Sequence, residues 1–242
     1  MNTKNRLELL DIFRAIAIIF MILFHTYYLG INIFDYQKII FSSQIWFYIW
    51  KLSAILFFII ASISYFFAKL KYGAQINKKY LKKSLLLWFF AILITLFTYI
   101  FFPSQLIIFW VLHFFAVSFL ILPFFIGLNY IIQILIFFLA LFAKYLLFEN
   151  TNYFLLYIFW ISNQNYFSAD YYPLIPYFFL ITLWYYLWIL INKYELKKYL
   201  SIKKEYKSVK FLQIIWKNSL LIYILHQPII FLIFYVVKGL VK

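Results

Sequence analysis

Apolar residues fill the chain in long blocks, and short polar segments separate one block from the next. About seven blocks reach helix length, at roughly 7–29, 45–70, 84–102, 106–127, 128–148, 170–192 and 220–238. A transmembrane helix needs about 20 predominantly apolar residues. The pattern therefore predicts an all-α fold, a polytopic integral membrane helical bundle with about seven transmembrane helices. A further apolar piece at 153–161 is too short to span, so we expect it to lie in the interface or to dip back.

Composition supports the same class of protein. Hydrophobic residues make up 67% of the 242 residues and charged residues only 12%, which excludes an ordinary soluble domain. The blocks are of helix length, whereas the strands of a transmembrane barrel are alternating segments of about 10 residues. The chain has no cysteine. Disulfides, thiolate metal sites and cysteine nucleophiles are therefore excluded.

The net charge of +15 is spread along the chain in a way that indicates topology. Six lysines lie in 69–83 and eight in 193–217, whereas the segment 30–44 holds only Lys38. Cytoplasmic loops carry the excess of Lys and Arg, so we expect a cytoplasmic N-terminus and an outer C-terminus. The lipid bilayer is the expected partner, and no nucleic acid is expected. The first block runs past twenty residues without a small-residue cleavage site, so we expect it to remain as a span.

The first block carries three ionisable residues, Asp11, Arg14 and His25. Residues three apart are neighbours on a helix, and a spacing of eleven returns to within about 20° of the same direction. All three side chains should therefore share one face. An ionisable group in hydrocarbon costs at least ~2.5 kcal/mol on lenient scales and normally faces the bundle interior. The stripe thus indicates a functional site, and the alternative is an interfacial ion pair in which Arg14 reaches the headgroups.

Other polar residues fall inside or beside later blocks: His113, Asp170, His226 and Gln227. Pro228 lacks an N–H, which frees the carbonyl of Ile224 beside two polar side chains. With the expected topology, these residues predict one polar chamber that opens outward, with Asp11 and Arg14 at its inner end. A lone intramembrane histidine can also serve only to bind a neighbouring helix. No spacing of histidines predicts a metal site.

Several motifs resemble a known family. Asp11-x-x-Arg14, followed by ten residues and His25, resembles the first helix of the membrane-embedded acyltransferase superfamily. More narrowly, the chain resembles bacterial relatives of the heparan-alpha-glucosaminide N-acetyltransferase catalytic domain. The further matches are FWVLHF at 109–114, DYYPLIP at 170–176 and NSLLIYILHQP at 218–228. They extend from the first helix to the last, which suggests a single transmembrane acyltransferase-like domain over 1–242.

The resemblance implies a membrane-embedded acyltransferase. It would move an acyl group, typically acetyl, from a cytosolic donor such as acetyl-CoA or another acyl-CoA. The acceptor would be a sugar or glycan at the outer face of a bacterial cytoplasmic (inner) membrane. His25 would act as base or transient acyl carrier, which suits histidine's ordinary pKa of about 6.5, and Asp11 and Arg14 would organise the donor end. The acceptor-site residues implied are His113, Asp170, His226 and Gln227.

No metal cofactor is expected, and the resemblance leaves homo-oligomer formation open. Two other classes of function compete with the enzyme. One is a small-molecule transporter in which the same residues relay protons through the membrane. An odd number of spans and the lack of a visible inverted repeat argue against it. The other is a structural subunit of an envelope assembly.

Overall fold

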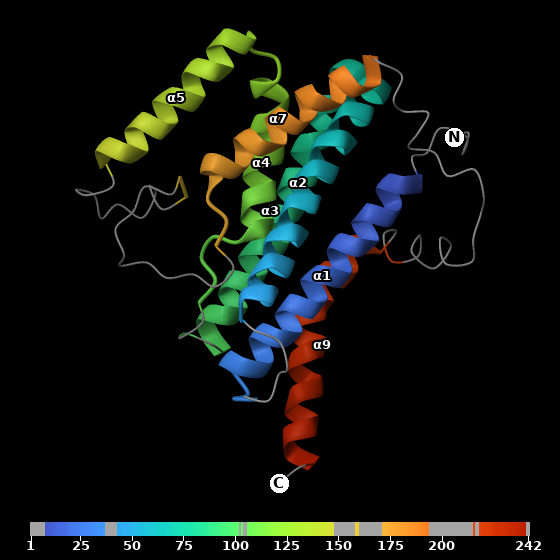
Figure 1. Ribbon diagram of the computed structural model, residues 1–242, viewed down its shortest axis with the longest axis vertical. Coiled ribbons are helices and arrows are strands. Elements are labelled where there is room, and N and C mark those ends of the chain that lie inside the picture. The colour runs from blue at the N-terminus through green and yellow to red at the C-terminus, as the bar shows by residue number, and fades with distance from the viewer. Residues whose placement is uncertain are drawn as a thin grey trace. The chain divides into compact units, whose positions relative to one another are not determined.

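The computed structural model describes residues 8–36, 43–101, 103, 106–147, 158–159, 171–193, 215 and 218–240. Their helices are α1 (Glu8–Asn32), α2 (Ser43–Tyr72), α3 (Ile76–Phe101), α4 (Val111–Phe125), α5 (Tyr130–Leu147), α7 (Leu174–Lys193) and α9 (Ser219–Leu240) (Figure 1). Within these ranges the only β-type pairing is an isolated bridge between Trp110 and Tyr171. The predicted all-α class is therefore confirmed for the described part of the chain.

Helix length confirms an integral membrane protein but not the number of spans. Four stretches are long and apolar enough to cross a bilayer: Leu10–Asn32, Ser43–Phe101 (which holds α2 and α3), Leu174–Lys193 and Ser219–Leu240. Val111–Phe125 and Tyr130–Ala143 are shorter apolar helices. The 15 residues of α4 rise only about 22 Å, less than the ~30 Å hydrocarbon core. The prediction of about seven spans is thus supported only in part.

The start of α4 differs from the predicted start of the fourth block at residue 106. Residues 106–110 are not helical, and their backbone bonds instead to two threonines of α3. The Thr95 hydroxyl donates to the Ile107 carbonyl (2.8 Å), and the Ile107 N–H donates to the Thr98 hydroxyl (3.2 Å). Irregular backbone is tolerated at membrane depth where protein satisfies its polar groups. The hydrophobic pattern cannot reveal this, because the residues remain apolar.

The first lysine-rich segment is a tight turn rather than a long loop. A 3-10 turn, η2 (Gly73–Gln75), joins α2 to α3, which begins at Ile76. Gly73 has φ +48°, a backbone conformation that strains residues with a side chain. Because α3 begins at Ile76, the lysines from 78 to 83 lie in its first turns. This placement is favourable, since lysine is a good helix former. The predicted break is confirmed, but its predicted length, to residue 83, is wrong.

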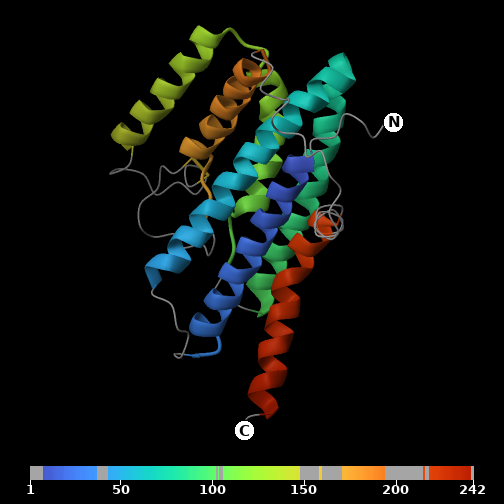
Figure 2. The same ribbon diagram turned by 45° about the vertical axis from the view of Figure 1, so that its right-hand side comes forward.

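Backbone contacts group the chain into two compact units, Met1–Ala61 with Trp188–Lys242, and Ser62–Leu187. In the described part of the first unit, α1 and α9 lie side by side, as both views show (Figures 1 and 2). Ala15 and Ala17 of α1 are fully buried. The Ser53 hydroxyl of α2 donates to the Ala17 carbonyl at 2.9 Å. Small residues let helix backbones approach closely, which is how helices associate in lipid.

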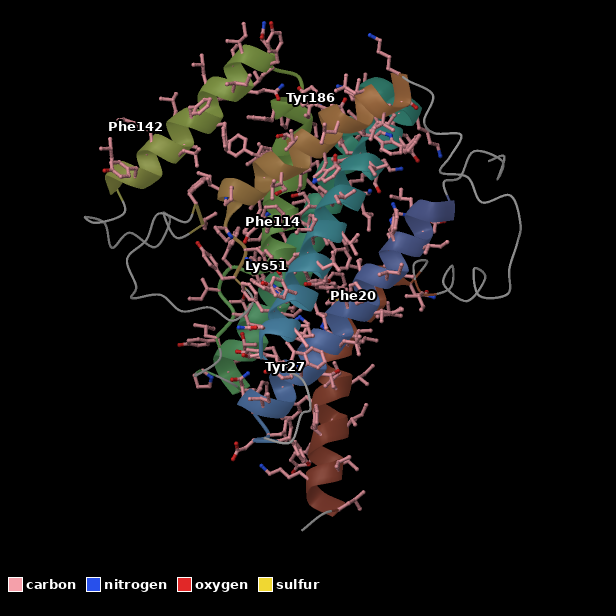
Figure 3. All side chains as sticks on the ribbon, viewed as in Figure 1. Phe20, Tyr27, Lys51, Phe114, Phe142 and Tyr186 are labelled. Carbon is pink, nitrogen blue, oxygen red and sulfur yellow. The ribbon has the colours of Figure 1, made fainter. Side chains whose placement is uncertain are left out.

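The second unit uses the same device between α3 and α4. The Ser84 hydroxyl of α3 donates to the carbonyl of the fully buried Ala116 in α4, at 2.7 Å. The amide of Gln133 in α5 donates to the hydroxyl of Tyr186 in α7 at 2.7 Å; Tyr186 is labelled in Figure 3. A hydroxyl or amide thus fixes each of these helix contacts. The prediction of one domain over 1–242 stays a prediction.

Candidate active site on α1 and α9

Asp11 and Arg14, predicted to be neighbours on one helix face, form an ion pair at the start of α1. An Arg14 Nη1 atom lies 3.2 Å from Asp11 Oδ1, one turn away, and forms both a hydrogen bond and a salt bridge. Asp11 is only 2% exposed, whereas the Arg14 side chain is 23% exposed. A buried carboxylate needs a charged or hydrogen-bonding partner, and Arg14 provides one.

The third residue of the stripe, His25, meets α9. His25 is 4% exposed, and its Nδ1 atom lies 3.2 Å from the Nε2 atom of Gln227. Its ring centroid lies 5.0 Å from that of His226. Three residues that the sequence singled out on two different helices are therefore in contact. We call His25, Tyr223, His226 and Gln227 the α1–α9 cluster.

His226 is held by its own helix. The residue is 5% exposed, and its Nδ1 atom lies 2.6 Å from the carbonyl oxygen of Tyr223. The carbonyl that His226 contacts is that of Tyr223. The helix α9 continues through Pro228, and the prediction that Pro228 frees the Ile224 carbonyl stays a prediction. Sequence reasoning missed Tyr223, although side chains in a helix point back toward the preceding turn.

The α1–α9 cluster has the groups that proton transfer requires. Two imidazole rings lie together away from solvent, and each has one nitrogen that can accept a proton and one that can donate it. Histidine is the side chain most often used for general acid–base catalysis near neutral pH. The cluster can therefore remove a proton from an acceptor and return one to a leaving group.

His113 lies in the second unit, in a different environment. It is 4% exposed, and its ring meets the edge of Trp88 at 5.4 Å and the ring of Phe109 at 5.7 Å, measured between centroids. Among the described residues, its Nδ1 atom has no hydrogen-bond partner. We call Trp88, Phe109 and His113 the α3–α4 cluster. It contains a single imidazole, flanked by two aromatic rings.

The remaining site predictions are only partly tested. The bridge between Trp110 and Tyr171 joins two of the segments that carry the family resemblance, 109–114 and 170–176. Asp170 itself lies outside the described residues. His25 and His226 are in contact, whereas the outward-opening chamber, with His113 and Asp170 in it, stays a prediction. No group of three or more potential metal ligands occurs among the described residues.

A comparison with protein families gives one match. The family described as "Heparan-alpha-glucosaminide N-acetyltransferase, catalytic" matches residues 6–228. The matched range includes the Asp11–Arg14 pair and the whole α1–α9 cluster, and it ends at Pro228. No curated protein and no solved structure matches the chain.

Proposed function

The chain belongs to the heparan-alpha-glucosaminide N-acetyltransferase catalytic family, and from this premise we propose that it acetylates a sugar or glycan. Family membership and the apolar helices indicate an integral membrane protein with acetyltransferase-type activity. The finer proposal is that an acyl-CoA, typically acetyl-CoA, donates the acyl group from the cytosolic side. The acceptor is a sugar hydroxyl or amine at the outer face.

The buried contact between His25 and His226 carries this proposal. Acyl transfer requires a base that deprotonates the acceptor. It also requires a hydrogen-bond donor or positive group where negative charge develops on the carbonyl oxygen. Two imidazoles in contact, away from solvent, can supply both. Polar groups are costly inside a membrane and usually have a function there.

The other candidate residues receive supporting roles. We propose that Asp11 and Arg14 organise the donor end, because the Arg14 side chain is partly exposed and a guanidinium can bind a phosphate or carboxylate with two parallel hydrogen bonds. Gln227 positions His25. For the second unit we propose that His113 binds substrate, since ligand sites combine aromatic walls with a few polar groups. Asp170 is proposed to bind the acceptor on the family resemblance alone.

The proposed orientation places the N-terminus in the cytoplasm of a bacterial cell, with seven spans in its cytoplasmic membrane. The lysines on either side of η2 and in 193–217 support it. The chain has no cysteine, so single-cysteine variants need no further background change. In intact cells, an impermeant thiol reagent should label Asn32→Cys but neither Gln75→Cys nor Ser208→Cys. Labelling of either of the last two from outside would contradict the orientation.

The enzyme and the transporter are separated by one experiment. Purified protein is incubated with acetyl-CoA labelled in its acetyl group, with glucosamine as the acceptor probe. Transfer to glucosamine, hydrolysis of the thioester, or labelling of the protein supports the acyltransferase. No turnover and no labelling, together with proton movement into vesicles that depends on His25, supports the transporter instead.

A further inference from the structure

The position of the proton on His226 follows from its hydrogen bond. The carbonyl oxygen of Tyr223 can only accept a hydrogen bond. The contact of 2.6 Å therefore requires that Nδ1 of His226 donates, so Nδ1 carries a hydrogen. A neutral imidazole has one such hydrogen, which leaves Nε2 of His226 with a bare lone pair. Among the described residues this Nε2 atom is buried and has no hydrogen-bond partner.

His25 has the opposite arrangement. The amide nitrogen of Gln227 can only donate a hydrogen bond. Nδ1 of His25 must therefore accept at the 3.2 Å contact, and the hydrogen of the neutral ring is on Nε2. Two histidines whose ring centroids are 5.0 Å apart thus have different tautomers. A carbonyl determines the tautomer of His226, and a side-chain amide determines that of His25.

We infer that His226 is the general base of the proposed acyl transfer, and that His25 supplies a hydrogen-bond donor rather than a base. This inference rests on the function proposed above and divides the chemistry of its site between the two histidines. A base needs a lone pair that no hydrogen bond occupies, and Nε2 of His226 has one. An unsatisfied acceptor in a buried site costs free energy, and a substrate proton would satisfy it.

The reaction then balances without any further reagent. Nε2 of His226 takes the proton of the acceptor hydroxyl or amine, while the acceptor heteroatom forms a bond to the carbonyl carbon of an acyl thioester. The carbonyl oxygen gains negative charge and accepts a hydrogen bond from the Nε2–H of His25. When the carbonyl re-forms, the carbon–sulfur bond breaks, and the departing thiolate takes the proton from His226. The products are the acylated acceptor and a free thiol.

The tautomers can be measured directly, without any substrate. The chain has only three histidines, so labelling with ¹⁵N-histidine gives three imidazole pairs in an NMR spectrum of the full-length protein in nanodiscs. His25→Gln and His226→Asn assign the signals by removing one pair each. At a pH where the rings are neutral, we expect the hydrogen on Nδ1 in His226 and on Nε2 in His25. A hydrogen on Nε2 in His226, or on Nδ1 in His25, would overturn the inference whether or not the protein is active.

The kinetic test uses substitutions that retain one hydrogen bond and remove the rest of the ring. The amide of His226→Asn can still donate to the Tyr223 carbonyl but has no basic nitrogen, so kcat should fall about 10²–10⁴-fold. The amide of His25→Gln can still donate near the former Nε2 position, so kcat should fall less than about tenfold. Removing an oxyanion donor outright lowers kcat by more than this. Ile230→Val, a conservative change at a buried position of the same helix, serves as the packing control.

The assay uses labelled acetyl-CoA under two conditions. Glucosamine is present in the first, and water is the only acceptor in the second. If wild-type protein neither transfers nor hydrolyses, the proposed function is wrong and the inference fails with it. Suppose that wild-type protein is active but kcat of His25→Gln falls by the factor that was expected for His226→Asn. Then only the assignment of the base is wrong. A loss in Ile230→Val comparable to that in His226→Asn would show that packing of α9, rather than the imidazole, is responsible.

Discussion

The α1–α9 cluster and the α3–α4 cluster both contain buried histidines, but their surroundings differ. In the first, a side-chain amide and a backbone carbonyl determine which nitrogen of each ring carries hydrogen. In the second, the rings of Trp88 and Phe109 flank His113, and its Nδ1 atom has no hydrogen-bond partner among the described residues. Aromatic contacts orient a ring without selecting its tautomer. The difference matches the roles proposed above, proton transfer for the first cluster and substrate binding for the second.

Helix packing does not explain this difference. Each unit contains a serine hydroxyl that donates to the carbonyl of a fully buried alanine on a neighbouring helix, Ser53 to Ala17 and Ser84 to Ala116. The two units thus use the same means of close approach. Their chemistry differs because only the first unit brings two histidines and an amide together.

The largest expected effect is on the first cluster. His25→Ala removes the proposed hydrogen-bond donor, and kcat for acetyl transfer should fall about 10²–10³-fold. Thr26→Ala is the matched control, because the Thr26 hydroxyl donates to the Ile22 carbonyl of its own helix (2.8 Å) and makes no other hydrogen bond within the described ranges. Initial rates with labelled acetyl-CoA and glucosamine measure both. Equal losses in the two variants would mean that α1 packing, rather than the imidazole, supports the reaction.

A smaller and different effect is expected in the second cluster. His113→Phe keeps an aromatic ring beside Trp88 and Phe109 but removes the imidazole nitrogens. If His113 binds substrate, KM for glucosamine should rise by up to about tenfold, the worth of one ordinary hydrogen bond. The value of kcat should change much less, since uniform binding affects KM alone. A fall in kcat as large as that of His25→Ala would abolish the distinction between the two clusters.

The smallest effects are expected where the two units resemble each other. Ser53→Ala and Ser84→Ala each remove one hydrogen bond between helices, which in membrane proteins is worth about 0.6 kcal/mol and at most about 1.7 kcal/mol. Both variants should lower the free energy of unfolding in detergent by similar amounts. Ser43→Ala, at an exposed position that starts α2, should change nothing. A much larger loss in one variant would show that the two serine contacts are not equivalent.

Much of the helical architecture and part of the site could be predicted from the amino-acid sequence alone. Asp11 and Arg14 are neighbours because a spacing of three puts two residues on one face of any helix. The helix α7 begins at Leu174, directly after Pro173 and within the region where the sixth block was expected to start, since proline is tolerated in a first helical turn. By contrast, the start of α4 depends on Thr95 and Thr98 of another helix. The length of the turn at Gly73 depends on a backbone conformation that composition does not reveal.

The amino-acid sequence by itself determined which stretches form apolar helices and which polar residues lie within them. Those properties depend on hydrocarbon length and on the cost of ionisable groups, both of which act on residues close together in the chain. Only the tertiary structure decided that His25 meets Gln227, 202 residues away, and therefore which nitrogen of His25 carries hydrogen. A tautomer is set by the atom that faces it, and here that atom belongs to another helix for His25 and to the preceding helical turn for His226.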